Sequence, residues 1–369
     1  MIKILDSKIE IKSRYKLTKK NLPIIYTPGV AELSREIAKN KKRVYSLTWK
    51  KNSVAIVSDG SAVLGLGNLG PEAALPVMEG KAILFKELGG VDAVPIMLST
   101  QNTEEIIETV KNIAPGFGGI NLEDISAPRC FEIERRLIAE LDIPVFHDDQ
   151  HGTAIAVLAG LVNALKVAEK NIKNIKIIVS GAGAAGIAIS KLLLEYGAKN
   201  IITFDSRSPI CKRCAYNKND AKDELAKKTN LENFKGNLHE AIIGADVFIG
   251  VSAPNLLQSE DVAKMNKNAI VFAMSNPEPE ISYKDAKKGG AMIVATGRSD
   301  FPNQINNALV FSGLFRGALD TRTRFITDKL KIKAALAIAG LVKNPKSDRI
   351  VPEVLDKKVV QAVARVFKK

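Results

Sequence analysis

Residues 175–205, IKIIVSGAGAAGIAISKLLLEYGAKNIITFD, decide the fold of the second half of the chain. A β-branched run leads into the loop GAGAAG, a helical pattern follows, and a second apolar run ends at Asp205. In such a unit the glycines admit a pyrophosphate to the helix N-terminus, and the acid binds the adenine ribose. The stretch therefore predicts a doubly wound, Rossmann-type α/β domain that binds NAD or NADP.

The predicted cofactor site is built around this loop. Asp205 favours NAD because it repels a 2′-phosphate, whereas Arg207 nearby would accommodate NADP, so both cofactors remain open. Three further strands, at residues 246–251, 269–274 and 292–295, extend the sheet. The cofactor-binding residues that we expect are Gly181, Gly183, Ala184, Ala185, Gly186, Asp205, Arg207, Ser252 and Asn276.

The same glycine spacing occurs earlier, in the loop GLGNLG at residues 65–70. This loop lies several residues after its strand, is followed by Pro71 and has no matching acid. We interpret it as a loop that brings backbone close to a substrate, or equally as a plain structural turn.

Two pairs of adjacent carboxylates carry the second chemical signal. Glu123-Asp124 and Asp148-Asp149 each follow a short apolar run, and a helical stretch at residues 129–140 separates them. Because a strand–helix–strand crossover makes the strands parallel, we expect both pairs at one carboxyl edge of a sheet. Four acids there repel each other unless a cation lies among them, and oxygen ligands favour Mg²⁺ or Mn²⁺. The alternative is that each acid only caps a helix or a turn.

The chain is long enough for two domains with sizeable cores, at 369 residues. We expect a substrate and metal domain at residues 1–150, the dinucleotide domain at 151–325 and a helical segment at 326–369. A hinge at residues 152–156 would leave the two ligand edges facing each other across a cleft.

Composition narrows the classes of function. The formal charge of +14 comes from Lys and Arg spread along the chain among acids, which favours a solvated surface over nucleic-acid binding. No apolar run approaches membrane-spanning length, and the start lacks the apolar block of a signal peptide. We therefore expect no membrane partner and a cytoplasmic location.

The three cysteines are too few for a disulfide framework, which supports a reducing compartment. Cys211 and Cys214 form a single CxxC in a polar stretch, whereas Cys130 stands alone. Without a second cysteine pair or a nearby histidine, a structural zinc site would be incomplete. We expect ordinary loop thiols, with a metal or redox role as the alternative.

Eight motifs, in consistent order between roughly residues 20 and 325, resemble the malic enzyme family in its short prokaryotic and archaeal form. They are YTPGVAE, SDGSAVLGLGNLGP, EGKAILFKELGGVDAVPI, NLEDI, HDDQHGTA, GAGAAG, MSNPEPEI and ATGRSDFPNQINNALVF. The resemblance implies oxidative decarboxylation of L-malate to pyruvate and CO₂, with NAD or NADP and a divalent cation, Mg²⁺ or Mn²⁺. It also implies a homodimer in which the N-terminal segment packs on its partner.

The resemblance assigns roles to the acids as well. Glu123, Asp124 and Asp149 match the family's metal ligands, and Asp148 matches a supporting acid behind them. Long members of the family carry an arginine for the substrate carboxylate where this chain has Ser, Ala and Val at residues 61–63. The groups that we expect to replace this arginine are Asn276, Asn307 and the backbone amides of the GLGNLG loop.

Tyr26 and Lys81 match the family's acid–base pair, and both are expected to contact the substrate. Patterns in the sequence alone would have singled out neither of them. Lys81 precedes an apolar run, where partial burial would lower its pKa enough to make it a base. In the implied mechanism Lys81 takes the hydroxyl proton during hydride transfer, and Tyr26 protonates C3 of the enolate after CO₂ has left.

Other classes of function remain as alternatives. In a metal-independent 2-hydroxyacid or amino-acid dehydrogenase the four acids would be structural, and activity would survive a chelator. A catalytically silent nucleotide-binding regulator would bind the dinucleotide without turnover. A basic nucleic-acid binder would show a strong salt dependence of binding.

Overall fold

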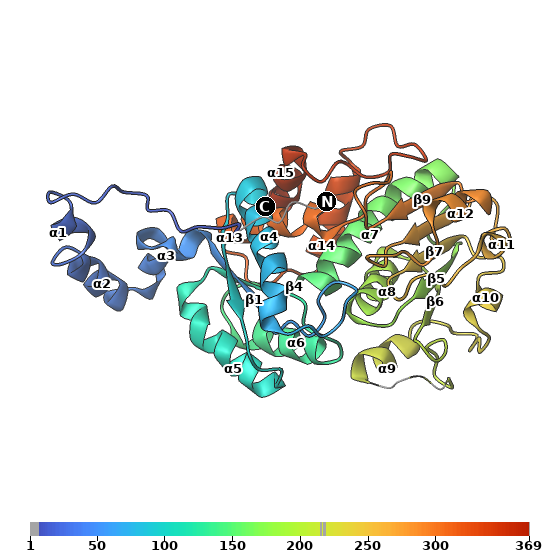
Figure 1. Ribbon diagram of the computed structural model, residues 1–369, viewed down its shortest axis with the longest axis horizontal. Helices are drawn as coiled ribbons and strands as arrows, with labels where there is room; N and C mark the ends of the chain where they lie inside the picture. Colours follow the sequence, from blue (N-terminus) through green and yellow to red (C-terminus); the bar gives the residue numbers. More distant parts are fainter. Residues whose placement is uncertain (1–6, 215, 217–218, 369) are drawn as a thin grey trace.

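The computed structural model describes residues 7–214, 216 and 219–368, and its architecture rests on two parallel sheets that lie side by side (Figure 1). The first sheet has the order β2-β1-β3-β4, with β1 (Ser53–Ser58), β2 (Asp92–Met97), β3 (Gly119–Leu122) and β4 (Val145–His147). The second has the order β6-β5-β7-β8-β9, with β5 (Lys176–Ser180), β6 (Asn200–Phe204), β7 (Val247–Gly250), β8 (Ile270–Ala273) and β9 (Ile293–Thr296). The predicted α/β class with a doubly wound dinucleotide sheet is confirmed.

Helices cover both sheets, as all-parallel sheets require. Those of the first sheet are α4 (Pro71–Gly89), α5 (Thr103–Ile113) and α6 (Arg129–Glu140). Those of the second are α8 (Ala184–Tyr196), α9 (Asp220–Ala226), α10 (Leu238–Ala241), α11 (Ser259–Val262) and α12 (Tyr283–Lys288). The 3₁₀ turns are η1 (Lys41–Arg43), η2 (Trp49–Asn52), η3 (Ala114–Gly116) and η4 (Asn307–Leu309).

Helix α7 (Asp148–Ala168) starts directly after β4 and runs through the centre of the molecule between the two sheets (Figure 1). It is long and apolar enough to cross a membrane, contrary to the expectation from sequence, but 78% of that window is buried inside the protein. It is therefore a core helix. The expected hinge at residues 152–156 is wrong, because these residues form uninterrupted helix within α7.

The C-terminal helices α13 (Phe311–Thr321), α14 (Asp328–Ala339) and α15 (Lys357–Arg365) join the two halves. Phe311 and Phe315 of α13 pack on Phe85 of α4, with ring centroids 4.7 and 5.5 Å apart. Helix α14 packs against α7. One apolar core thus includes side chains from both sheets, and it fixes the positions of the two ligand-binding edges relative to each other.

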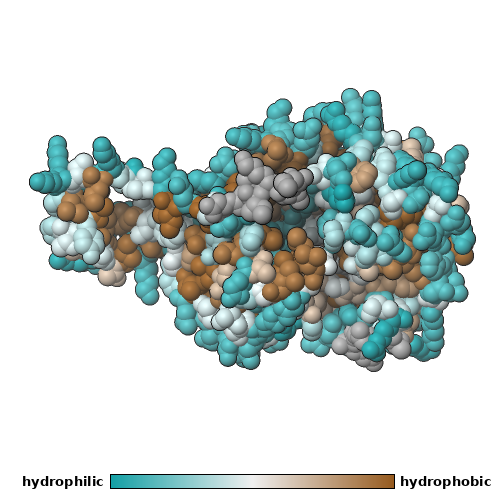
Figure 2. All heavy atoms as spheres, in the orientation of Figure 1, coloured by the Kyte–Doolittle hydropathy of each residue, from teal (hydrophilic) through white to brown (hydrophobic). Residues whose placement is uncertain are grey.

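The N-terminal helices α1 (Leu22–Ile25), α2 (Val30–Lys39) and α3 (Val44–Leu47) project from this body as an arm (Figure 1). None of these three helices contains a buried residue. Apolar side chains are exposed on the arm (Figure 2), among them Ile24 at 71% and Tyr26 at 68%. Exposed apolar surface of this kind is typical of a region that contacts another molecule.

Candidate active site

The two predicted acid pairs meet at one edge of the first sheet. Strands β3 and β4 are parallel neighbours, with Leu122 opposite His147, so the residues that follow each strand emerge together. Glu123, Asp124 and Asp149 offer carboxylate oxygens that all lie within 4.8 Å of one another. The expected convergence of the acids is therefore present in the structure.

The environment of these acids suits a divalent cation. Burial and, after it, the charges of Asp149 and Glu123 together raise the pKa of Asp124 to about 9. Burial likewise raises the pKa of Glu123 to about 7, which Lys81 opposes. The Oδ2 atom of Asp124 is buried and has no hydrogen-bond partner among the described residues. An all-oxygen donor set with unrelieved negative charge fits Mg²⁺ or Mn²⁺.

Lys81 lies in the middle of these acids, on α4, with 6% of its side chain exposed. Its Nζ donates to Oε1 of Glu123 at 2.5 Å and also to Oδ2 of Asp148. Burial lowers the pKa of Lys81, but Asp148, Glu123 and Asp149 together raise it above its usual range. The expected lowering is wrong in its net direction, because the sequence argument counted burial alone. A base at this position needs these acids neutralised first.

A cavity of about 430 Å³ opens between this edge and the dinucleotide loop. Asp148 lies beneath it, fully buried, and holds Lys81 in place. The predicted site residues that line the cavity are Lys81, Glu123, Asp124, Asp149, Ala185, Ser252, Asn276 and Asn307. The structure thus brings the metal, base, amide and dinucleotide candidates to one space.

The loop GLGNLG closes one side of this cavity. A Cβ atom on Gly65 would lie 1.7 Å from the backbone oxygen of Asn276, so only glycine permits this approach between the two halves. Leu64 and Gly65 both line the cavity. This placement agrees with a loop that brings backbone to a substrate, and the same contact also serves a structural purpose.

The dinucleotide loop has the geometry that its glycines predict. Gly181 has a φ of 111°, and α8 begins at Ala184 with Gly183 as its N-cap. A Cβ atom on Gly186 would lie 1.7 Å from the backbone oxygen of Gly181, so the third glycine lets helix and strand pack closely. The loop lies between β5 and β7, where the strand order reverses, and this is the place where such sheets bind ligands.

The ribose end of this site holds a residue that the sequence did not single out. Lys222 on α9 donates from Nζ to Oδ2 of Asp205 at 2.9 Å, and both side chains are nearly buried, at 11% and 8% exposed. Arg207, the cation that sequence reasoning named, is exposed. Only the packing of α9 beside the end of β6 identifies Lys222, because the chain is rich in lysine.

Tyr26 does not reach the cavity within its own chain. It caps the C-terminal end of α1 on the arm, is 68% exposed, and is absent from the residues that line the cavity. The acid that the resemblance assigns and the base at Lys81 are therefore separated in one copy of the protein.

A buried carboxylate supports the metal edge from behind, and sequence reasoning missed it. Glu134 on α6 accepts from the backbone N–H of His147 at 2.8 Å and from Nε2 of Gln150 at 3.0 Å. Its oxygen also lies 2.9 Å from Nε2 of His151. Burial alone would raise the pKa of Glu134, but His151 and its neighbours lower it to about 2. Glu134 thus fixes the turn that presents Asp149.

The cysteines of the CxxC are not free thiols. Cys211 and Cys214 form a disulfide in the loop after Asp205, whereas Cys130 is free and buried in α6. The expectation of ordinary loop thiols at this pair is therefore wrong.

Comparison with family models gives two matches that together span most of the chain. Residues 6–138 match the N-terminal domain of malic enzymes, and residues 150–368 match the malic enzyme NAD-binding domain.

Individual relatives agree with these matches. The NAD-dependent malic enzyme of Geobacillus stearothermophilus is 57% identical over 360 residues, covering 97% of this chain and 74% of that protein. The bifunctional malic/malolactic enzyme of Bacillus subtilis is 53% identical, covering 100% and 90%. The NADP-dependent malic enzyme of Halomonas elongata is 46% identical, covering 89% and 77%.

Solved structures show the same fold. The NAD-dependent malic enzyme of Thermotoga maritima superposes with a TM-score of 0.94 at 48% identity, covering 98% of this chain and 96% of that one. The malic enzyme of Pyrococcus horikoshii gives a TM-score of 0.92 at 50% identity, covering 97% and 85%.

Proposed function

The chain belongs to the malic enzyme family, and from this premise we propose how its residues share the reaction. The reaction is the oxidative decarboxylation of malate to pyruvate and CO₂, with reduction of NAD or NADP. The observation that supports the residue roles best is the single cavity lined by the acid edge, Lys81 and the dinucleotide loop. A domain boundary near residue 150, between the two sheets, and a cytoplasmic location are part of the proposal.

Glu123, Asp124 and Asp149 would hold Mg²⁺ or Mn²⁺. A divalent cation bound there supplies Lewis-acid polarisation of the substrate oxygen and stabilises the enolate that follows loss of CO₂. The chain's own contribution is rigid placement: Asp124 donates from its backbone N–H to Oδ2 of Asp149 at 2.8 Å. Glu134 holds the turn before Asp149 in the same way.

Lys81 acts as the base for the malate hydroxyl. Burial is the largest single influence on its pKa, and once the neighbouring carboxylates are neutralised it is no longer offset and favours the neutral amine. Asp148 accepts a hydrogen bond from Nζ and therefore keeps the amine pointed at the cavity. Lys81 takes the hydroxyl proton, and a nicotinamide cofactor bound at the GAGAAG loop would supply the hydride acceptor for C2.

Asn276 and Asn307 fix the substrate carboxylate in place of the arginine of long family members. Both line the cavity from the dinucleotide half, opposite the acids. Neutral amides donate hydrogen bonds there without adding a charge beside the metal ligands.

Tyr26 protonates C3 of the enolate, and it does so in the site of a second copy. In its own chain Tyr26 is exposed on an arm whose helices contain no buried residue. A homodimer would cover the apolar side chains of that arm and deliver Tyr26 to the partner's cavity. The dimer is thus part of the active site in this proposal.

The experiment that tests the function uses the purified chain with L-malate, Mn²⁺ and either NAD or NADP. Reduced nicotinamide and pyruvate should appear together in equal amounts, and a chelator should stop both. Reduced cofactor formed without pyruvate, or activity that survives the chelator, would point instead to a metal-independent hydroxyacid dehydrogenase.

A further inference from the structure

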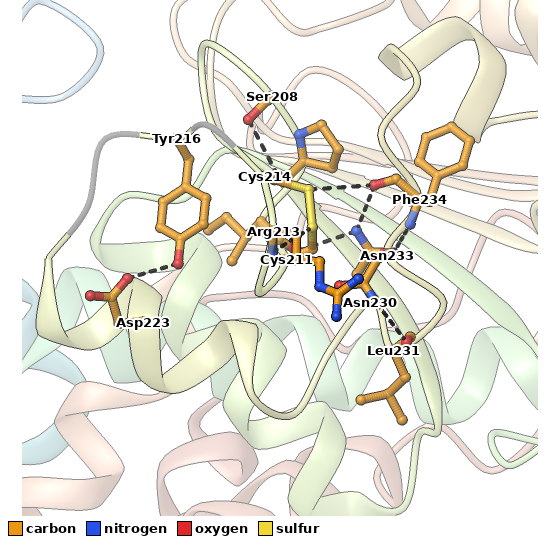
Figure 3. The surroundings of a disulfide bond; sticks show 12 residues. Ser208, Cys211, Arg213, Cys214, Tyr216, Asp223, Asn230, Leu231, Asn233 and Phe234 are labelled. Atoms are coloured by element: carbon orange, nitrogen blue, oxygen red, sulfur yellow. Dashed lines mark hydrogen bonds between the residues drawn. A yellow bond between two sulfur atoms is a disulfide. The ribbon is translucent and has the colours of Figure 1, made fainter.

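The loop after Asp205 carries a chemical feature that the reaction does not use. Cys211 and Cys214 are joined there by a disulfide (Figure 3). Cys211 is completely buried, whereas Cys214 is partly exposed. The two sulfurs therefore differ in access from solvent.

This loop contacts the elements that surround the ribose site: the glycine loop with α8, strand β6 and helix α9. Ile210, next to Cys211, is buried against Ala182 of the glycine loop, Ile187 of α8 and Leu225 of α9. Its backbone N–H donates to the carbonyl of Thr203 at 2.7 Å, which ties it to β6. The segment before the disulfide therefore contacts β6, the strand directly before Asp205, and the helix that carries Lys222.

The disulfide also closes against a second loop. Asn230 donates from Nδ2 to the carbonyls of Ile210 and Phe234, at 3.3 and 2.9 Å, and accepts from the backbone N–H of Phe234. The sulfur of Cys214 lies 3.7 Å from the same carbonyl of Phe234 (Figure 3). The S–S bond to Cys211 and the contact with Phe234 therefore hold Cys214 between the two loops.

We propose that Cys211 and Cys214 form a reversible thiol–disulfide site, opened by a dithiol reductant, which sets the affinity of the adjoining ribose site for the nicotinamide cofactor. This rests on the proposed function, because it concerns the cofactor of that reaction. The oxidised loop is held in its binding geometry before the cofactor arrives. Reduction removes the cross-link, so the cofactor must order the loop when it binds. The entropy lost in that ordering weakens cofactor binding.

The exchange is balanced as a two-electron step. A thiolate of the dithiol attacks the partly exposed Sγ of Cys214, the S–S bond breaks, and Cys211 leaves as a thiolate that then takes a proton. The backbone N–H of Arg213 donates to Sγ of Cys211 at 3.4 Å and supports that leaving thiolate. The second thiol of the donor resolves the mixed disulfide, which frees Cys214 and releases the donor as a disulfide.

The test compares the full-length enzyme after oxidation with diamide and after reduction with dithiothreitol, each followed by removal of the reagent. Alkylation under denaturing conditions should label one of the three cysteines, Cys130, in the oxidised form and all three in the reduced form. The KM for the preferred cofactor should rise about threefold to tenfold on reduction, while kcat and the KM for malate stay within about twofold.

Two variants complete this test. The double variant Cys211→Ser/Cys214→Ser should show the higher cofactor KM under both treatments, and Cys130→Ser should keep the full response. Equal cofactor KM values in forms labelled once and three times would overturn the proposal, as would three labels after diamide. Fluorescence titration with reduced cofactor measures the affinity without turnover. Absence of malate turnover in either form counts against the proposed function alone.

Discussion

The metal edge of the first sheet and the ribose edge of the second treat charge in opposite ways. At the metal edge, burial and like charges raise the pKa values of Glu123 and Asp124, and among the residues that the structure describes Lys81 is the one cation that lines the cavity. At the ribose edge Asp205 is already paired with Lys222. At the first site the carboxylates outnumber Lys81, so a bound cation would relieve the excess negative charge. At the second site one acid is paired with one lysine before any ligand binds. Substitutions should therefore affect chemistry at the first edge and affinity at the second.

The variant Asp149→Asn should give the largest difference between the two edges. Loss of a metal ligand removes several kcal/mol of transition-state stabilisation, so turnover should fall by at least about 10³-fold. Cofactor affinity should stay within about twofold, because the two sites lie on different sheets. Manganese titration and fluorescence titration with reduced cofactor measure the two effects separately, and Glu195→Gln, at an exposed acid on α8, is the control. An equal loss of both affinities would show that the edges are not independent.

The arm provides the second test, because it decides whether the metal edge is complete in one copy. Tyr26→Phe and Lys81→Ala should each lower turnover by about 10² to 10⁴-fold, the usual contribution of a positioned acid or base. If Tyr26 acts in the partner, each mixed dimer contains one intact site. Equal amounts of the two variants, unfolded and refolded together, should recover about a quarter of the wild-type activity.

The control for this mixture is each variant refolded alone. No recovery in the mixture, with mixed dimers demonstrated by mass, would place Tyr26 in the site of its own chain. In that case the arm would have to fold back onto its own body.

The ribose edge should give a smaller effect, on cofactor preference. Lys222→Ala removes the cation available to a 2′-phosphate and releases Asp205 to bind the ribose hydroxyls. A bond to a charged group is worth about 1.5 to 3 kcal/mol, so the preference should shift about tenfold or more towards NAD. The ratio of kcat/KM for the two cofactors measures this shift. Arg207→Ala is the matched control. A larger shift in that variant would mean that Arg207, rather than Lys222, binds the 2′-phosphate.

Local patterns in the sequence predicted the framework of both edges. The apolar run before Glu123 forms β3 and the helical stretch at residues 129–140 forms α6 with the expected bounds, because an apolar run and a helical period are properties of the segment itself. The convergence of the acids followed from the rule that crossovers make parallel strands. Each of these inferences needed only neighbours in sequence.

Contacts between distant segments could not be predicted in this way. Lys222 and Glu134 gain their roles from packing beside Asp205 and the turn before Asp149, and neither sits in a distinctive pattern. The hinge was misplaced because Gly152 lies within the uninterrupted helix α7, where it leaves room for Asp148: a Cβ atom on Gly152 would lie 1.9 Å from Oδ1 of Asp148. The pKa of Lys81 was misjudged for the same reason, since its acids come from other elements.

The smallest effect concerns the stability of the metal-free protein, and its sign follows from the metal edge. A carboxyl group whose folded pKa is raised contributes stability at low pH and loses it as the pH rises through that folded value. Burial and neighbouring acids raise the folded pKa values of Asp149, Glu123 and Asp124 to about 6, 7 and 9. The melting temperature in a chelator should therefore fall by a few degrees, roughly 2 to 5, between pH 6 and pH 9. Lys81, whose pKa is raised, stays protonated through this range and does not reverse the slope. Added Mn²⁺ should flatten the slope, and Asp124→Asn should reduce it without metal, whereas Asp205→Asn at the balanced edge should leave it unchanged. A melting temperature that rises over this range in the chelator would mean that the acids of the metal edge are satisfied without a cation.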